Sequence, residues 1–474
     1  MAQAFPGSSM RSALISSLVL HALGLRHHLH GSALKRNEGY TVRLHNHANV
    51  QYTGEFSVGK QILPVVYDTG SFDVIVLSTL CAQCPEALAK YDRGRSASFT
   101  SGEDITAEHH FGSGPVRSKK GYETVRLGGQ DSPFSATHMP FYQVLSHGIA
   151  VWNSQAAFSG IVGLGHPATV PQGFSADAGV GDASSDKTLV ETVKMNVFAF
   201  CLARSGDSPD DLPAGLFQLG DGSLNLREKH PQSFVTVPVL GEVHWSVRMT
   251  GFRAPGLDVT MPSICDPSCG AIVDSGTSLI AVPPSALPFV TALDGLVKRD
   301  CSNLDKLPIL EFDLDTGAGQ ATTIQLPPKA YVMKVRRQLE QGSSSWKELF
   351  GWGRSSSDEA AQSEFECSPA FMLLDKESQL GPVWILGMPF LRYYYTIFDR
   401  SNGQPKIYIA RSTPTCEVEK GGNTLNFINS TQAGGWQSMR RSFLANDFTP
   451  TTMDINATLP LGWSSAASGM QLRL

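Results

Sequence analysis

Two short segments of the same pattern, one in each half of the chain, constrain the fold more than any other feature of this sequence. The first is Asp68-Thr69-Gly70-Ser71 and the second is Asp274-Ser275-Gly276-Thr277-Ser278. Each follows a short apolar run typical of a β-strand, and its glycine permits a tight turn with close backbone approach. A single copy is an ordinary turn sequence. Two copies indicate two related halves, each of which supplies one carboxylate.

Paired carboxylates have a definite chemical use. Two carboxylates forced together resist ionising at the same time, so they share a proton and can act as an acid–base pair. We therefore predict that Asp68 and Asp274 are catalytic. The hydroxyl residues that follow each aspartate could hydrogen-bond the carboxyl groups and hold them coplanar.

A second repeated feature strengthens the idea of two halves. Residues 158–165 form an apolar strand between glycines, and residues 383–390 are its counterpart. Each follows its own aspartate-containing segment at a similar distance along the chain. The internal repeat therefore has two members in each half, in the same order.

Composition limits the class of protein. The chain has 474 residues, of which 41% are hydrophobic and 17% are charged, enough for two to three domains and a large core. Its 45 glycines and 28 prolines favour many turns and a β-rich fold. The net charge of −5 is too near neutral for a nucleic-acid binder. No uninterrupted apolar run reaches about 20 residues, so we expect no membrane-spanning helix.

The eight cysteines have spacings unlike those of zinc sites, and we expect no metal. Disulfide bonds are favoured instead, which implies an oxidising compartment. Arg11 and the apolar residues 12–20 resemble a signal peptide; the alternative is an N-terminus without a targeting role. Two glycosylation sequons begin at Asn429 and Asn456, which weakly favour secretion.

The segment from Phe99 to Gly129 is predicted to form two strands joined by a turn with two glycines, residues 111–115. A glycine-rich hairpin tip lacks large side chains and can lie across a ligand. The alternative is an ordinary hairpin.

Taken together, these residues resemble the pepsin-like aspartic proteases over about residues 51–410. The two aspartate segments resemble the catalytic loops of that family, and Ile161-Val162-Gly163 and Ile385-Leu386-Gly387 resemble the strands beneath them. The resemblance implies a mainly all-β, bilobal fold, with two related β lobes flanking a substrate cleft. The implied division is a signal or leader (1–39), an N-terminal lobe with Asp68 and a flap (40–230), a C-terminal lobe with Asp274 (231–411) and a tail (412–474).

The resemblance also implies an aspartic endopeptidase that works at acidic pH, in which Asp68 and Asp274 activate a water. Thr69 and Ser275 should cross-link the two loops, and Ser71 and Thr277 should bond the outer carboxylate oxygens. The implied substrate-binding and flap residues are Gly70, Ile75, Phe111, Gly112, Ser113, Gly114, Gly276 and Ser278. The family usually has a tyrosine at the position of Phe111 and a tryptophan at the position of Ile75, and the tyrosine hydroxyl hydrogen-bonds the tryptophan indole. Phe111 and Ile75 cannot form this bond, so the flap lacks it here.

Family bridges are implied for Cys265–Cys269 and Cys301–Cys367, and a loop bridge with shorter spacing for Cys81–Cys84. Cys201 and Cys416 then remain and are paired by elimination.

The resemblance further implies a peptide or protein substrate, sensitivity to pepstatin-like inhibitors, no cofactor and a monomeric chain in the secretory pathway, either secreted or in an acidic endomembrane compartment. A competing hypothesis is a non-catalytic binding or inhibitor protein on the same fold, because fold alone does not settle function.

Overall fold

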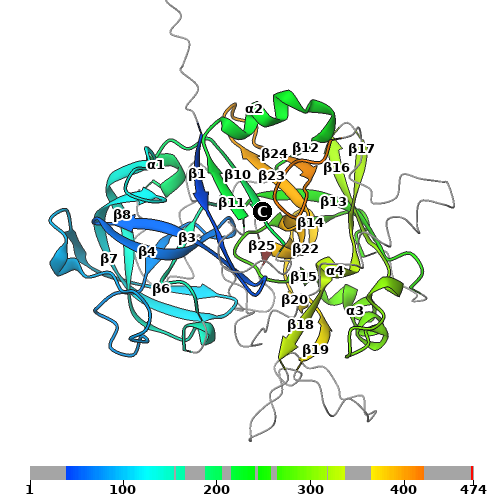
Figure 1. Cartoon of the computed structure of the whole chain (residues 1–474), viewed down its shortest axis with the longest axis horizontal. Coiled ribbons are helices and arrows are strands. Elements are labelled where there is room, and N and C mark those ends of the chain that lie inside the picture. Colours follow the sequence, from blue (N-terminus) through cyan, green and yellow to red (C-terminus); the bar gives the residue numbers. More distant parts are fainter. Residues whose placement is uncertain are drawn as a thin grey trace, which may run out of the picture. The chain divides into compact units, whose positions relative to one another are not determined.

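The computed structural model describes residues 39–153, 156–165, 187–204, 215–240, 244–257, 264–317, 319–336, 365–420 and 471–472. The predicted leader lies outside the described residues except for its last residue, Gly39, and both sequons also lie outside them. No helix among the described residues is long and apolar enough to cross a membrane. The fold is built mainly from strands in four sheets (Figure 1), which confirms the expected all-β class.

The sheet of the N-terminal half has eight strands in the order β2-β3-β4-β9-β5-β8-β7-β6. Its strands are β2 (His45–His47), β3 (Gln51–Val58), β4 (Gln61–Asp68), β5 (Val74–Val76), β6 (Thr100–Phe111), β7 (Gly114–Leu127), β8 (Ser135–His147) and β9 (Gly160–Gly163). The β-branched residues Val65 and Val66 of β4 are buried, as suits a strand packed on both faces. β4 pairs in parallel with β9, which places Asp68 opposite Gly163.

The sheet of the C-terminal half repeats this arrangement. Its main path is β17-β16-β13-β14-β22-β15-β20. In addition, β21 pairs with β22, and β25 pairs with β21. Its strands are β13 (Ser246–Arg253), β14 (Cys269–Val273), β15 (Ile280–Val282), β16 (Leu310–Gly317), β17 (Gln320–Leu326), β20 (Phe371–Leu373), β21 (Glu377–Ser378), β22 (Gly381–Leu386) and β25 (Gln471–Leu472). β14 pairs in parallel with β22, with Val273 opposite Leu386. Both repeated segments of the sequence thus form the same parallel strand pair.

A third sheet combines strands from both halves of the chain (Figure 1). Its order is β1 (Tyr40–Arg43), β11 (Gly215–Leu219), β10 (Val197–Leu202), β23 (Tyr394–Asp399), β24 (Lys406–Arg411) and β12 (Val235–Pro238). β10 and β23 are antiparallel, and Phe198 stacks on Phe398 with ring centroids 4.9 Å apart. Trp245 packs edge-on against both rings. An aromatic core therefore joins the two halves of the chain.

Short elements complete the described fold. A two-stranded sheet pairs β18 (Val332–Arg336) with β19 (Phe365–Pro369). The helices are α1 (Leu189–Thr192), α2 (Gly222–Lys229), α3 (Leu287–Leu296), α4 (Pro328–Tyr331) and α6 (Met388–Leu391), with 3-10 turns at Arg93–Arg95, Ala150–Asn153, Pro231–Ser233, Pro284–Ala286 and Leu304–Lys306. Pro288 lies in the first turn of α3, where a proline does not remove a helical hydrogen bond.

Four disulfide bonds join the same cysteines that the sequence analysis paired. They are Cys81–Cys84, Cys265–Cys269, Cys301–Cys367 and Cys201–Cys416. The Cys201–Cys416 bond joins cysteines 215 positions apart. It links β10 to the residues that follow β24.

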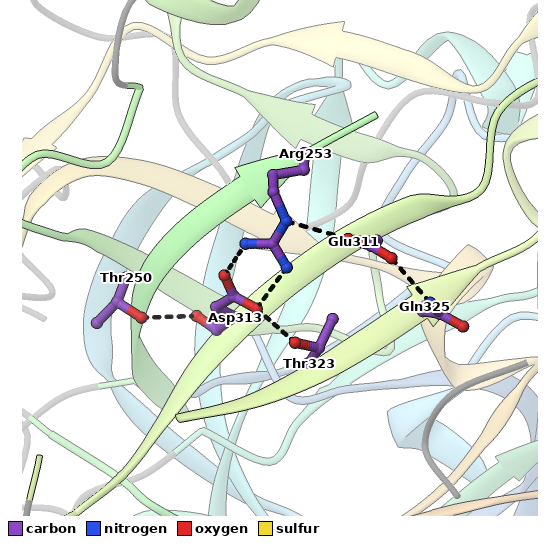
Figure 2. Close-up of polar contacts among 6 residues, drawn as sticks. All are labelled: Thr250, Arg253, Glu311, Asp313, Thr323 and Gln325. Atoms are coloured by element: carbon purple, nitrogen blue, oxygen red, sulfur yellow. Dashed lines mark hydrogen bonds and ion pairs between the residues drawn. The ribbon is translucent and has the colours of Figure 1, made fainter. Parts of the chain in front are cut away.

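An ion-pair cluster lies on the outer strands of the C-terminal sheet. Figure 2 shows the Arg253 guanidinium of β13 between Glu311 and Asp313 of β16, whose carboxylates also accept hydrogen bonds from Gln325 and Thr323 of β17. About half of the Arg253 side chain is exposed, so we expect a small net stabilisation from each pair. The cluster links three neighbouring strands, β13, β16 and β17.

Candidate active site

The two aspartates begin matching turns and are fully buried. Asp68 is the last residue of β4, and Asp274 directly follows β14. In each turn the glycine amide two positions on donates to the inner carboxylate oxygen, at 2.9 Å for Gly70 and 2.8 Å for Gly276. The predicted hydroxyls contact the other oxygen. Ser71 Oγ donates to Asp68 Oδ2 at 2.6 Å, and Thr277 Oγ1 donates to Asp274 Oδ2 at 2.5 Å.

Each turn lies directly against the carboxylate of the other turn. A Cβ atom on Gly70 would stand 2.6 Å from Asp274 Oδ2, and one on Gly276 would stand 2.3 Å from Asp68 Oδ1. Real Cβ atoms do not come so close to an oxygen, so only glycine fits at either position. The two carboxyl groups, far apart in the sequence, are therefore neighbours in one buried site.

This environment changes the protonation of the pair. The pKa of Asp68 is raised well above its ordinary value, first by burial and then by the charge and hydrogen bond of Asp274. The hydrogen bonds from Ser71 and the Gly70 amide act in the opposite direction. Because like charges this close cannot both form easily, the pair retains one proton to a higher pH than a free carboxyl would.

Two hydroxyl residues cross-link the turns reciprocally. Thr69 Oγ1 donates to the Val273 carbonyl at 2.8 Å and accepts from the Ser275 amide at 3.0 Å. Ser275 Oγ donates to the Tyr67 carbonyl at 2.7 Å and accepts from the Thr69 amide at 3.1 Å. The side chains of Thr69 and Ser275 thus fasten one half of the chain to the other.

The glycine-flanked strands lie under the turns. The Leu164 amide donates to the Asp68 carbonyl at 2.7 Å, and the Asp274 amide donates to the Leu386 carbonyl at 3.1 Å. A Cβ on Gly163 would come within 2.4 Å of the Phe72 backbone, and one on Gly387 within 2.2 Å of the Leu279 carbonyl oxygen. These glycines are required because the turn backbone passes directly over them.

The predicted flap is a hairpin of β6 and β7, in which Phe111 pairs with Gly114. Phe111 and Ile75 belong to one buried hydrophobic cluster, with 6% and 1% of their surfaces exposed. Gly112 and Ser113 form the turn between the strands, and the Ser113 hydroxyl is buried. A Cβ on Gly114 would meet the Gly148 carbonyl at 2.4 Å, so the hairpin tip packs closely against the end of β8.

Ser278 has a different place from the other predicted substrate-binding residues. Its hydroxyl is buried and donates to the Val50 carbonyl at 2.6 Å. Arg392 donates from Nη1 to the neighbouring Asn49 carbonyl at 2.8 Å. Both contacts fasten residues 49–50 to the second half of the chain. The sequence analysis missed Arg392 and these contacts, since no local pattern marks a bond to a distant backbone carbonyl.

The site can therefore supply a proton donor and a proton acceptor side by side. Among the described residues, no group of three or more His, Cys, Asp or Glu side chains could hold a metal ion.

Comparison with known proteins agrees with this geometry. Residues 51–347 match the family model described as eukaryotic aspartyl protease. Pepsin A from Bos taurus is 28% identical over 375 residues, which cover 76% of this chain and 84% of that protein. Cathepsin D from Clupea harengus is 28% identical over 403 residues, or 81% and 88% of the two chains. Plasmepsin VI from Plasmodium berghei (strain Anka) is 26% identical over 372 residues, or 75% and 74%. These matches confirm the resemblance seen in the sequence: the chain belongs to the eukaryotic aspartyl protease family and is an aspartic-type peptide hydrolase.

Proposed function

We propose that the protein is an endopeptidase that cleaves peptide bonds at acidic pH, with Asp68 and Asp274 as its catalytic pair. One observation carries the proposal. Each buried carboxylate lies against the glycine of the opposite turn, and the pKa of Asp68 is raised by burial and by Asp274. Neighbouring carboxyl groups that share one proton are suited to general acid–base catalysis.

In this mechanism one carboxyl of the pair is ionised and the other is protonated. The ionised carboxylate accepts a proton from a water molecule, whose oxygen attacks the carbonyl carbon of the peptide bond. The protonated carboxyl donates its proton to the carbonyl oxygen, and the pair later protonates the leaving amine. The titration belongs to the pair, so neither aspartate has a fixed role before substrate binds. Ser71 and Thr277 hold the outer oxygens in place.

Acidic pH follows from the same environment. When the pH rises through the pKa of the pair, the second carboxyl also ionises and the site loses its proton donor. We therefore expect activity to fall as the pH rises toward neutral.

Substrates are peptides or proteins. We propose that an extended segment binds between the turns and the flap hairpin, where Gly70 and Gly276 place no side chain beside the carboxylates. Phe111, Ile75, Gly112, Ser113 and Gly114 would form the wall and lid over the substrate. Ser278 would act indirectly, because its hydroxyl already bonds Val50. A transition-state analogue such as pepstatin should bind the same site, and a single chain should suffice, since both aspartates come from it.

The four disulfide bonds support an oxidising environment. We therefore propose the secretory pathway, with a secreted or acidic endomembrane location.

The test is cleavage of a denatured protein at acidic pH, with and without pepstatin. Asp68→Asn and Asp274→Asn should each lower kcat by roughly a hundredfold to ten-thousandfold, because each removes half of the acid–base pair. Asp305→Asn is the matched control, since Asp305 is exposed. Circular dichroism would verify that the variants fold. Full activity in either dyad variant would contradict the mechanism, and a folded wild type without pepstatin-sensitive cleavage would favour the competing hypothesis of a binding protein.

A further inference from the structure

We infer that His109 is a positioning residue whose ion pair with Asp73 fastens the flap hairpin to the turn that carries Asp68. The kinetic part of this inference rests on the proposed function, whereas the structural part does not. The inference begins with the contact itself: His109 Nδ1 lies 3.3 Å from Asp73 Oδ2.

The two residues belong to the elements that must stay together for a lid to cover the dyad. Asp73 follows the Asp68 turn and directly precedes β5, and its carbonyl accepts from the Gly163 amide at 2.9 Å. His109 lies on β6, two residues before Phe111. Because side chains alternate along a strand, His109 and Phe111 point to the same face of the hairpin. The ion pair therefore connects the inner face of the flap to the fixed backbone beside the dyad.

The second ring nitrogen of His109 is also held. Nε2 lies 2.9 Å from Ser118 Oγ on β7, and Ser118 Oγ donates to the Ala107 carbonyl at 3.3 Å. The Tyr142 ring of β8 packs edge-on against the imidazole at 4.6 Å between centroids. Only about a tenth of the His109 side chain is exposed. The ring is thus fixed by both flap strands and by β8.

Both ring nitrogens of His109 therefore have a polar neighbour on a different element. Nε2 lies beside Ser118 Oγ of β7, and Nδ1 lies beside the Asp73 carboxylate.

A neighbouring contact between the hairpin and the Asp68 segment is apolar. Phe111 and Ile75 pack in a hydrophobic cluster, and neither side chain can donate or accept a hydrogen bond. Apolar burial favours closure but does not specify an angle between the flap and the turn. The His109–Asp73 pair supplies that restraint, since it fixes one atom of the hairpin relative to one atom beside the catalytic turn.

The groups around His109 come from several elements. Asp73, Ser118 and Tyr142 face the ring from the Asp68 segment, β7 and β8. On β6 itself, Glu108 and His110 lie 3.6 Å apart and are more exposed. The Asp73 contact is therefore the one that links His109 to the Asp68 segment.

The first test measures hydrogen exchange of the flap amides, residues 111–117, in the full-length protein without substrate. His109→Leu and Asp73→Asn should each raise flap exchange about two- to fivefold, the range expected for loss of a partly exposed ion pair. The double variant should exchange no faster than the faster single variant, because both changes remove the same contact. His109→Gln, which can still donate to Asp73, should lie between His109→Leu and the wild type. His110→Gln is the matched control and should exchange like the wild type.

The second test measures cleavage of one peptide by the same variants. We expect KM to rise by about the same factor as flap exchange, with a smaller change in kcat, because the flap closes over bound substrate. Unchanged flap exchange in His109→Leu would overturn the inference. So would an altered cleavage preference with normal exchange, since His109 would then be a substrate contact. Failure of the dyad mechanism is distinguishable, because it abolishes wild-type cleavage and leaves the exchange differences in place.

Discussion

The reciprocal cross-link between the two turns gives the sharpest test of how the site is built. Thr69→Val keeps nearly the same shape and removes one hydroxyl. That hydroxyl donates to the Val273 carbonyl at 2.8 Å and accepts from the Ser275 amide at 3.0 Å. Thr69 is fully buried, so water cannot replace either bond. The substitution therefore leaves one acceptor and one donor of the opposite turn without a partner.

The magnitude follows from counting these groups. Each buried polar group left unsatisfied costs about 1–3 kcal/mol, so the two together lower the free energy of unfolding by about 2–6 kcal/mol. A typical domain has only about 5–15 kcal/mol of stability in total. Ser275→Ala removes the other half of the cross-link, where Oγ bonds the Tyr67 carbonyl and the Thr69 amide. It should lower stability by a similar amount.

Thr69→Ser is the control, because it keeps the hydroxyl and loses one methyl group, worth about 1 kcal/mol or less. The assay is denaturant unfolding followed by circular dichroism, together with peptidase activity at acidic pH. We expect Thr69→Val to lose both stability and kcat, since the two aspartates are no longer held at a fixed separation. If Thr69→Val unfolds within about 0.5 kcal/mol of Thr69→Ser, the cross-link does not stabilise the site and the reasoning is refuted.

Two further predictions concern the carboxylates. The raised pKa of Asp68 means that the folded state binds its proton more tightly than the unfolded chain, so the contribution of Asp68 to stability is present at low pH and is lost as the pH rises through the folded pKa. Asp274→Asn removes the neighbouring charge, and its melting temperature should therefore fall less steeply between acidic and neutral pH than that of the wild type; parallel curves would contradict this. Gly276→Ala places a Cβ 2.3 Å from Asp68 Oδ1 and should lower kcat by about a hundredfold through displacement of that carboxylate. Gly295→Ala, where a Cβ meets open space, is the control and should leave cleavage unchanged.

Much of the site could be predicted because its carboxyl and hydroxyl groups belong to one short local pattern that occurs twice in the chain. An aspartate after an apolar run, followed by glycine and hydroxyl residues, determines its own turn. The hydrogen bonds from Gly70 and Ser71 to Asp68 span only two and three positions. The glycine-flanked strands could also be predicted from the sequence. The parallel pairs β4–β9 and β14–β22 require glycine where one backbone crosses another.

The contacts that remained hidden are those between distant residues with no repeated pattern. Ser278 stands in a conspicuous segment, yet its hydroxyl bonds the Val50 carbonyl, and nothing near either residue indicates this. The His109–Asp73 pair depends on how far the hairpin folds back toward the turn, which alternation along β6 cannot determine. Likewise, the sheet that combines β10 with β23 depends on long-range packing of aromatic residues whose partners lie in the other half.

The two turns make nearly identical hydrogen bonds to their carboxylates. Each carboxylate accepts one glycine amide and one hydroxyl, at distances that differ by only 0.1 Å between the turns. These bonds cannot determine which aspartate is protonated when substrate arrives. The difference must come from what surrounds each turn, since Thr277 is fully buried whereas Ser71 is partly exposed. The predicted flap hairpin of β6 and β7 belongs to the N-terminal half. The internal repeat therefore builds the pair, whereas the unrepeated surroundings must give its two members different roles.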